Sequence, residues 1–150
     1  MHLVGSPVVV APDGRRLTHA VVQLDRLSVA DAPELFTALG DIELANQRLH
    51  LGWTAYAPNV WAGPVDLATK LALLTHAFDD CHMHRVKIQT DAINLRSQAA
   101  IARLGAVREG VLREHVLRAD GTWRDTVVFS ILAAEWPTVR ARLAGRLADA

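Results

Sequence analysis

Residues 90–106 read TDAINLRSQAAIARLGA, and residues 109–113 continue with EGVLR. Alternating apolar residues over Val86–Thr90 are typical of a half-buried strand. Asn94 is a favoured helix cap, and Gly105 can adopt the left-handed conformation that ends a helix after Leu104. This stretch therefore predicts a strand, a capped helix and a sharp stop.

A second strand and helix are predicted immediately before this stretch. Residues Leu49–Tyr56 alternate between apolar and small or polar types, which favours a strand. A Pro- and Gly-containing loop follows, and apolar residues then recur at helical spacing over Pro64–Phe78. A strand, a helix and a strand in this order predict a crossover that makes Leu49–Tyr56 and Val86–Thr90 parallel neighbours.

The C-terminal third predicts a hairpin and a last helix. Two β-rich stretches, Val107–Leu117 and Trp123–Leu132, flank an Asp120-Gly121 turn signal. A helical segment follows over Glu135–Leu147. These elements predict an α/β or α+β arrangement around one mixed sheet.

The N-terminal third gives weaker patterns. The first sixteen residues predict an arm or a short edge strand, and Leu17–Leu27 predicts a strand. The sequence Ser28-Val29-Ala30-Asp31 matches a capping box, which predicts a helix that ends at Leu39. We expect residues 1–150 to form a single domain.

The composition excludes several classes of function. Sixteen Lys and Arg balance sixteen Asp and Glu, so the charge gives no footprint for nucleic acid or for an anionic membrane. The single cysteine, Cys81, cannot form an intramolecular disulfide, and the sequence shows neither a secretory signal nor an apolar run that could span a bilayer. We therefore expect a soluble, cytoplasmic protein without nucleic-acid or membrane partners.

Four sequence blocks resemble one enzyme family. They are Leu51-Gly52-Trp53, residues 90–106, residues 109–113 and residues 124–130, in that order. They are similar to the corresponding blocks of the GCN5-related N-acetyltransferases, and in particular of the ribosomal-protein N-terminal (RimJ/RimL-like) acetyltransferases. The resemblance is best supported over residues 49–147.

The resemblance implies a mixed sheet flanked by helices, and transfer of acetyl from acetyl coenzyme A to a primary amine by direct attack. The acceptor would be a protein N-terminus or a small molecule, and no metal would be needed. Such chemistry needs a base for the ammonium, donors for the thioester carbonyl and an acid for the departing thiolate. A second copy of the chain, in a homodimer, could cover an exposed sheet edge.

The resemblance also implies where the cofactor binds. Pantetheine would lie along the backbone of Trp53, Thr54, Ala55 and Tyr56, where two neighbouring strands splay apart. Pyrophosphate would lie at the loop and helix start formed by Trp61, Ala62, Gly63, Val65 and Asp66. This loop matches the family pattern poorly, because it lacks a basic residue, has Pro64 and adds a carboxylate. A fold that has lost catalysis and serves as a binding module is therefore the alternative reading.

Ser97 and Asn94 are the catalytic candidates that the resemblance implies. Ser97 would protonate the thiolate, and Asn94 would orient the pantetheine or acetyl arm and also bind cofactor. A structural role explains both residues equally well, because an Asn cap and a first-turn Ser satisfy backbone groups. Tyr56 is a second candidate acid.

Two other polar clusters are better explained by structure than by chemistry. Asp79–His84, with His76 one turn earlier, contains metal-ligand types, but adjacent side chains alternate in direction and make tetrahedral ligation awkward. Glu114 and His115 could form an acid–base pair, although neighbouring strand residues face opposite sides.

The interval between the predicted helix and the strand that starts at Leu49 is shorter than the resemblance implies. Only about nine residues separate Leu39 from Leu49, where the family places a further helix and two strands. The second and third strands of the family fold are thus expected to be lacking, either because the chain is shortened or because a segment between Gly40 and Asp41 is omitted. The general base cannot be assigned, and Glu43 is a weak substitute.

Overall fold

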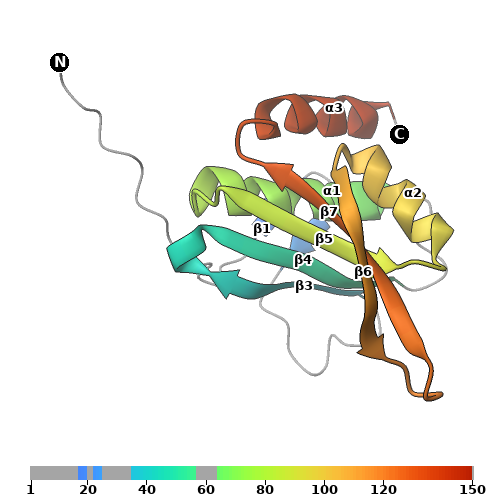
Figure 1. The fold of residues 1–150 in the computed structure, drawn as a ribbon. Coiled ribbons are helices and arrows are strands. Elements are labelled where there is room, and N and C mark those ends of the chain that lie inside the picture. Colours follow the sequence, from blue (N-terminus) through green and yellow to red (C-terminus); the bar gives the residue numbers. More distant parts are fainter. Residues whose placement is uncertain (1–16, 20–21, 25–34, 57–63, 150) are drawn as a thin grey trace.

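The computed structural model describes the backbone of residues 17–19, 22–24, 35–56 and 64–149, with side chains over 41–52 and 64–149. Five strands form one mixed sheet in the order β3-β4-β5-β7-β6 (Figure 1). The strands are β3 (Leu35–Glu43), β4 (Arg48–Tyr56), β5 (Arg85–Asp91), β6 (Val107–Leu117) and β7 (Trp123–Leu132). β4 and β5 are parallel, and every other pair in this sheet is antiparallel. The predicted mixed sheet, the parallel crossover and the C-terminal hairpin are confirmed.

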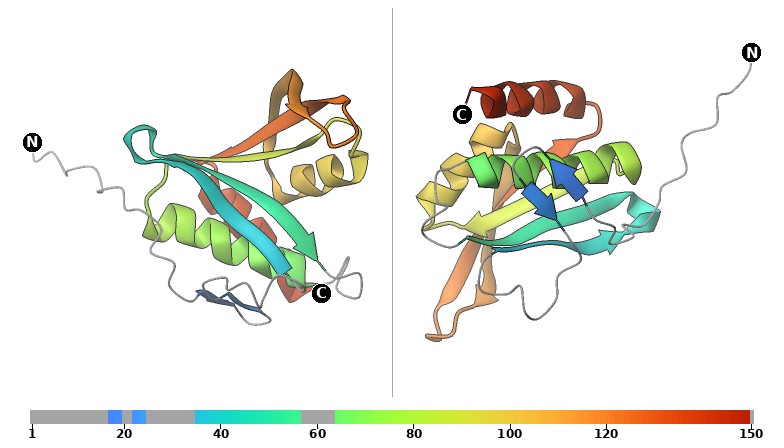
Figure 2. Two further views of the ribbon diagram at one scale, coloured as in Figure 1. Left: turned by 90° about the horizontal axis from the view of Figure 1, so that it is seen from below. Right: turned by 180° about the vertical axis from the view of Figure 1, so that it is seen from behind.

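Three described helices pack on one face of this sheet (Figure 2). Helix α1 spans Pro64–Thr75 and continues into a π-helical turn at His76–Asp80, α2 spans Leu95–Leu104, and α3 spans Trp136–Ala148. Alternate residues of the central strands face them, so one apolar core joins sheet and helices. Its fully buried side chains include those of Leu49, Leu51, Leu74, Val86, Val127, Ile131 and Leu143.

The sequence prediction of a helix that ends at Leu39 is wrong for the part that the structure describes. Residues Leu35–Glu43 form β3, which pairs antiparallel with β4 from Leu35↔Tyr56 to Glu43↔Arg48. The Leu and Ala residues of this stretch favour a helix locally, but the ladder with β4 is the stronger determinant. The proposed capping box at residues 28–31 lies outside the described residues.

β3 also corrects the expectation that only a link precedes the strand at Leu49. Gly40 and Asp41 both lie within β3, and Gly40 pairs with His50, so the described backbone has no break at this point. The register shifts between Gly40 and Glu43, where Asp41 has a φ of 45°. β4 therefore has a strand on each side.

The predicted strand over Leu17–Leu27 is two short strands instead. β1 (Leu17–His19) and β2 (Val22–Leu24) pair antiparallel, with Leu17 opposite Leu24. They lie beside α1 and form a separate two-stranded sheet. The predicted N-terminal arm at residues 1–16 lies outside the described residues.

The other face of the five-stranded sheet is polar over its centre. His50 of β4, Lys87 of β5 and Ser130 of β7 are neighbours across the strands, and His50 and Ser130 are buried. Ser130 donates a hydrogen bond to Glu109, whose carboxylate also pairs with Arg85. None of the helices in the described ranges covers this face, as Figures 1 and 2 show.

No helix within the described part of the chain has the length and apolar character needed to cross a membrane.

Lys70 is a charged residue on the buried side of α1. It is 6% exposed, and burial lowers the pKa of its ammonium group from 10.5 to about 8, partly opposed by Asp66. Asp66 lies one turn earlier on the same helix, which is the spacing of neighbouring side chains. At pH 7 the Lys70 side chain is therefore still charged, although its buried position favours the uncharged amine.

We expect Lys70→Met to raise the melting temperature at pH 7. The depressed pKa corresponds to a penalty on the order of 3 kcal/mol at most while both folded and unfolded states are protonated. Because the unfolded state binds the proton more tightly, the wild-type protein regains this stability as the pH rises through about 8 toward 10.5. Thermal melts of both proteins at pH 7 and pH 10 should show a smaller gain at pH 10; an equal gain would mean that packing, and not charge, is responsible.

Candidate functional site

The parallel strands β4 and β5 separate part-way along their length. They pair from Arg48↔Arg85 to Leu51↔Ile88, and no pair joins them beyond that point in the described backbone, although β4 continues to Tyr56 and β5 to Asp91. β3 stays paired with β4 as far as Tyr56, and β7 stays paired with β5 as far as Asp91. The outer strands thus hold the inner two apart, and Figure 2 (left) shows the resulting V.

The V presents backbone groups that the ladder does not use. Residues 52–56 of β4 and 89–91 of β5 each have an edge with no strand partner among the described residues. An extended ligand can add to such an edge through main-chain hydrogen bonds. Trp53, Thr54, Ala55 and Tyr56, predicted to bind pantetheine through their backbones, lie on this part of β4.

Helix α2 begins at the end of β5, beside the open end of the V. Asn94 is its cap: Oδ1 accepts a hydrogen bond from the Ser97 N–H at 2.9 Å. Ser97 lies half-buried in the first turn, so the structure brings the two predicted catalytic residues together. At the other end, Gly105 has a φ of 105° and stops the helix, as predicted.

A tight turn fixes the start of α2. Asp91 accepts a hydrogen bond from the Ile93 N–H at 3.1 Å and binds the Arg118 guanidinium through both carboxylate oxygens, at 3.0 and 2.8 Å. Burial alone would raise the pKa of Asp91, but the bonds from Arg118 and Ile93 outweigh it and lower the pKa. An ionised Asp91 therefore ties β5 to the β6–β7 hairpin and orients the turn that leads to Asn94.

The start of α1 lies after the end of β4. Pro64 is the first residue of α1, and Val65 and Asp66 lie in the first turn. Trp61, Ala62 and Gly63, the other predicted pyrophosphate residues, lie outside the described residues. The helix dipole favours an anion at this position, whereas the Asp66 carboxylate opposes one.

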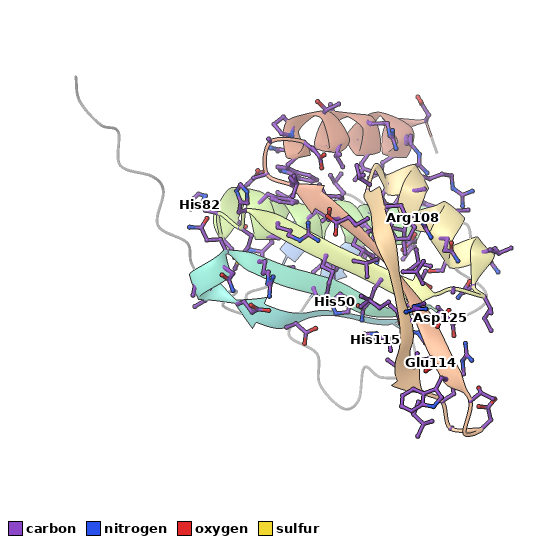
Figure 3. All side chains as sticks on the ribbon, in the orientation of Figure 1. His50, His82, Arg108, Glu114, His115 and Asp125 are labelled. Carbon is purple, nitrogen blue, oxygen red and sulfur yellow. The ribbon has the colours of Figure 1, made fainter. Side chains whose placement is uncertain are left out.

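His50 is a candidate site residue that sequence reasoning missed. Figure 3 labels it on β4, next to the point where β4 and β5 part. Its side chain is buried; Nδ1 lies 3.5 Å from the Asp41 carboxylate, and Nε2 has no hydrogen-bond partner among the described residues. Lys87, opposite His50 on β5, lies 3.4 Å from the same carboxylate. The alternation of residues along β4 could have indicated on which face of the sheet His50 lies. Its proximity to Asp41 could not be predicted, because the bulge in β3 brings Asp41 near.

The weak substitute for a general base, Glu43, is engaged elsewhere. It is exposed and accepts hydrogen bonds from Arg48 and Asn46, at 2.8 and 2.9 Å. Arg48, and then Asn46, lower the pKa of Glu43. A carboxylate held in this way is a poor proton acceptor.

The polar clusters that we assigned to structure have structural partners. Asp79 accepts hydrogen bonds from Trp136 Nε1 and Arg140, which join the end of α1 to α3. The exposed His115 contacts Thr126 Oγ1 through Nδ1, and the Glu114 N–H donates to Asp125. Figure 3 labels His115, Glu114 and Asp125 on the hairpin. Within the residues that the structure describes, no group of three or more His, Cys, Asp or Glu is arranged to hold a metal ion.

Comparisons with known proteins identify the fold. No protein-family model matches the chain. The curated protein "Putative ribosomal N-acetyltransferase YdaF" of Bacillus subtilis (strain 168) is 28% identical over 99 residues, which cover 66% of this chain and 53% of YdaF. A solved "putative acetyltransferase" from T. thermophilus is 43% identical over 74% of this chain and 58% of its own, with a TM-score of 0.71.

A solved GCN5-related N-acetyltransferase from Brucella melitensis gives a TM-score of 0.73, with 27% identity over 76% of this chain and 51% of its own. This chain is similar in sequence and in fold to the GCN5-related N-acetyltransferases. Mycobacterium smegmatis RimJ, solved in complex with CoA-disulfide, matches with a TM-score of 0.64 and 27% identity over 72% of this chain and 52% of its own. The chain thus spans about half the length of these relatives.

The α2 cap generates a stability prediction. Asn94→Ala removes the acceptor for the Ser97 N–H and should cost about 1 kcal/mol of unfolding free energy. Asn94→Asp keeps a capping oxygen and should restore most of that stability. Chemical denaturation of the three proteins measures the difference; if the Ala and Asp variants are equally stable, the side-chain cap is not what stabilises this end of α2.

Proposed function

We propose that this chain transfers acetyl from acetyl coenzyme A to a primary amine, either a protein N-terminus or a small molecule. The observation that carries the proposal is the V between β4 and β5, which offers unpaired backbone along residues 52–56 beside the start of α2. Pantetheine is an extended chain with amide groups, so such an edge suits it. The complex of RimJ with CoA-disulfide supports a coenzyme A ligand for this fold.

The reaction needs no covalent enzyme intermediate. The neutral amine attacks the thioester carbonyl carbon, the new C–N bond forms, and the C–S bond then breaks to release the thiolate. Backbone N–H groups of β4 would donate to the carbonyl oxygen, where negative charge develops. The acceptor nitrogen gives up one proton before the attack and a second after it, and it keeps one N–H in the product amide. The departing thiolate takes up one proton.

Ser97 is the proposed proton donor to the thiolate. Its hydroxyl lies in the first turn of α2, and its N–H is bound by Asn94 Oδ1. The cap thereby fixes the backbone that carries the hydroxyl and places Asn94 at the same end of the helix, where its amide can orient the pantetheine arm.

A catalytically inactive binding module is the second candidate. It is favoured by the start of α1, where Pro64 removes one N–H and Asp66 places a negative charge near the proposed pyrophosphate position. Such a module would keep the fold without holding the cofactor.

Acetyl coenzyme A separates the two candidates in a thermal-shift measurement. A ligand at 100 times its dissociation constant stabilises the folded state by about 2.7 kcal/mol, so an active enzyme should melt several degrees higher at millimolar cofactor. Acetate and adenosine serve as controls. If millimolar acetyl coenzyme A leaves the melting temperature unchanged, the binding-module reading replaces the enzyme reading.

Ser97→Ala should lower turnover more than cofactor affinity. A leaving-group acid acts mainly in the transition state, so the variant should lose roughly tenfold or more in kcat while its Kd for acetyl coenzyme A changes little. Ser97→Thr keeps a hydroxyl and is the matched control. Release of free thiol measures kcat, and calorimetry measures Kd; an unchanged kcat would make Ser97 a structural residue.

A further inference from the structure

The buried imidazole of His50 lies at the apex of the V. His50 and Lys87 form the third of the four pairs between β4 and β5, and Leu51 and Ile88 form the last. Gly52 is the first residue of β4 beyond this pairing. The apex is the point at which a ligand held between the strands would meet the end of the continuous sheet.

Gly52 shows in which direction the ring extends. A Cβ atom added at Gly52 would lie 2.8 Å from His50 Nε2 and 2.7 Å from its Cε1, which is closer than such atoms approach. The Nε2 end of the ring therefore lies over the Gly52 backbone, just beyond the last residue pair that joins β4 to β5. Only glycine at this position leaves room for this arrangement.

The partners of the ring define which nitrogen can accept a proton. The Asp41 carboxylate lies 3.5 Å from Nδ1, so the neutral ring is best placed with its hydrogen on Nδ1. Nε2 then carries the lone pair, and it is buried without a hydrogen-bond partner in the described part of the chain. A buried polar atom without a partner is costly, and this cost is removed when a ligand supplies the missing hydrogen.

The neighbouring charges keep the ring neutral. Burial, and then Lys87, lower the pKa of His50 below its ordinary value of 6.5, while Asp41 opposes them. Arg48, two residues earlier on β4, pairs with Glu43 at 2.8 Å. At neutral pH the imidazole can therefore accept a proton.

We propose that His50 is the general base that removes a proton from the acceptor amine, with Asp41 as the residue that holds its tautomer. This inference rests on the proposed acetyl transfer. His50 Nε2 takes one proton from the ammonium and later releases it to solvent. The neutral nitrogen of the acceptor amine then forms its bond to the acetyl carbon and gives up a second proton. The departing sulfur takes up one proton.

His50→Gln tests the proposal directly. It should keep acetyl coenzyme A binding and lose roughly 100-fold in kcat/KM, the contribution typical of a general base. Spermidine and a peptide with N-terminal alanine are the acceptor probes, and thiol release is the readout. The exposed residue His84 provides the control variant, His84→Gln, which should retain full activity. If His50→Gln binds the cofactor, melts like the wild type and keeps its activity, the inference is overturned while the proposed function stands.

Asp41→Asn and a pH profile separate a base from a packing residue. Asp41 has a positive φ of 45°, which asparagine tolerates, so the variant should fold. It should lose activity to a smaller extent than His50→Gln. In the wild type, kcat/KM should fall as the pH drops through the pKa of His50, below 6.5. An acid limb that persists in His50→Gln would assign the base elsewhere.

The tautomer of His50 can be measured whether or not either amine is accepted. Nitrogen NMR of the wild-type protein at pH 7.5, assigned with His50→Gln, should show hydrogen on Nδ1 and an unprotonated Nε2. Hydrogen on Nε2, or a charged ring at this pH, would overturn the proposal. If the protein binds acetyl coenzyme A but acetylates neither probe, this spectrum decides the role of His50, while the acetyl-transfer proposal is judged from the binding and turnover data.

Discussion

The structure depends on one short ladder between parallel strands. Four residue pairs, from Arg48↔Arg85 to Leu51↔Ile88, join β4 to β5, and the strands separate after them. The separation is stable because each strand keeps an antiparallel partner on its other side, β3 for β4 and β7 for β5. The sheet therefore satisfies the outer edges of both strands, while beyond Leu51 and Ile88 their inner edges have no strand partner in the described backbone.

The elements after the two strands converge on this opening because parallel strands end at the same edge of a sheet. β5 leads within a few residues to Asn94 and α2, while β4 leads through residues 57–63 to Pro64 and α1. The Asp91–Arg118 pair adds a tie from β5 to the hairpin, so the start of α2 is held from two sides. The groups that we propose to bind the cofactor are backbone atoms and helix ends, whose geometry the strands and helices themselves fix.

The sequence predicted those features that are determined locally. Asn94 and Gly105 mark the two ends of α2 by their own chemistry, and both positions were correct. β3 could not be predicted in this way, because its Leu and Ala residues favour a helix. Its strand conformation is determined by pairing with β4, which lies outside the segment itself. His50 was missed for a related reason. A histidine in an alternating strand is ordinary, and its distinction comes from Asp41 in a bulge and from Gly52 under the ring.

Asp66 illustrates how a residue that opposes the proposed ligand can still belong to its site. Taken alone, a carboxylate in the first turn of α1 repels pyrophosphate, and this is one of the reasons to consider an inactive protein. In the fold, however, Asp66 is the neighbour that raises the pKa of the buried Lys70 ammonium, which burial lowers. An anion that supports a cation one turn later forms a pair with little net charge, so its field falls off faster with distance than that of an isolated carboxylate. The cost to phosphate binding is thus smaller than the sequence suggests, and part of the role of Asp66 is to keep a charge inside α1 compatible with folding.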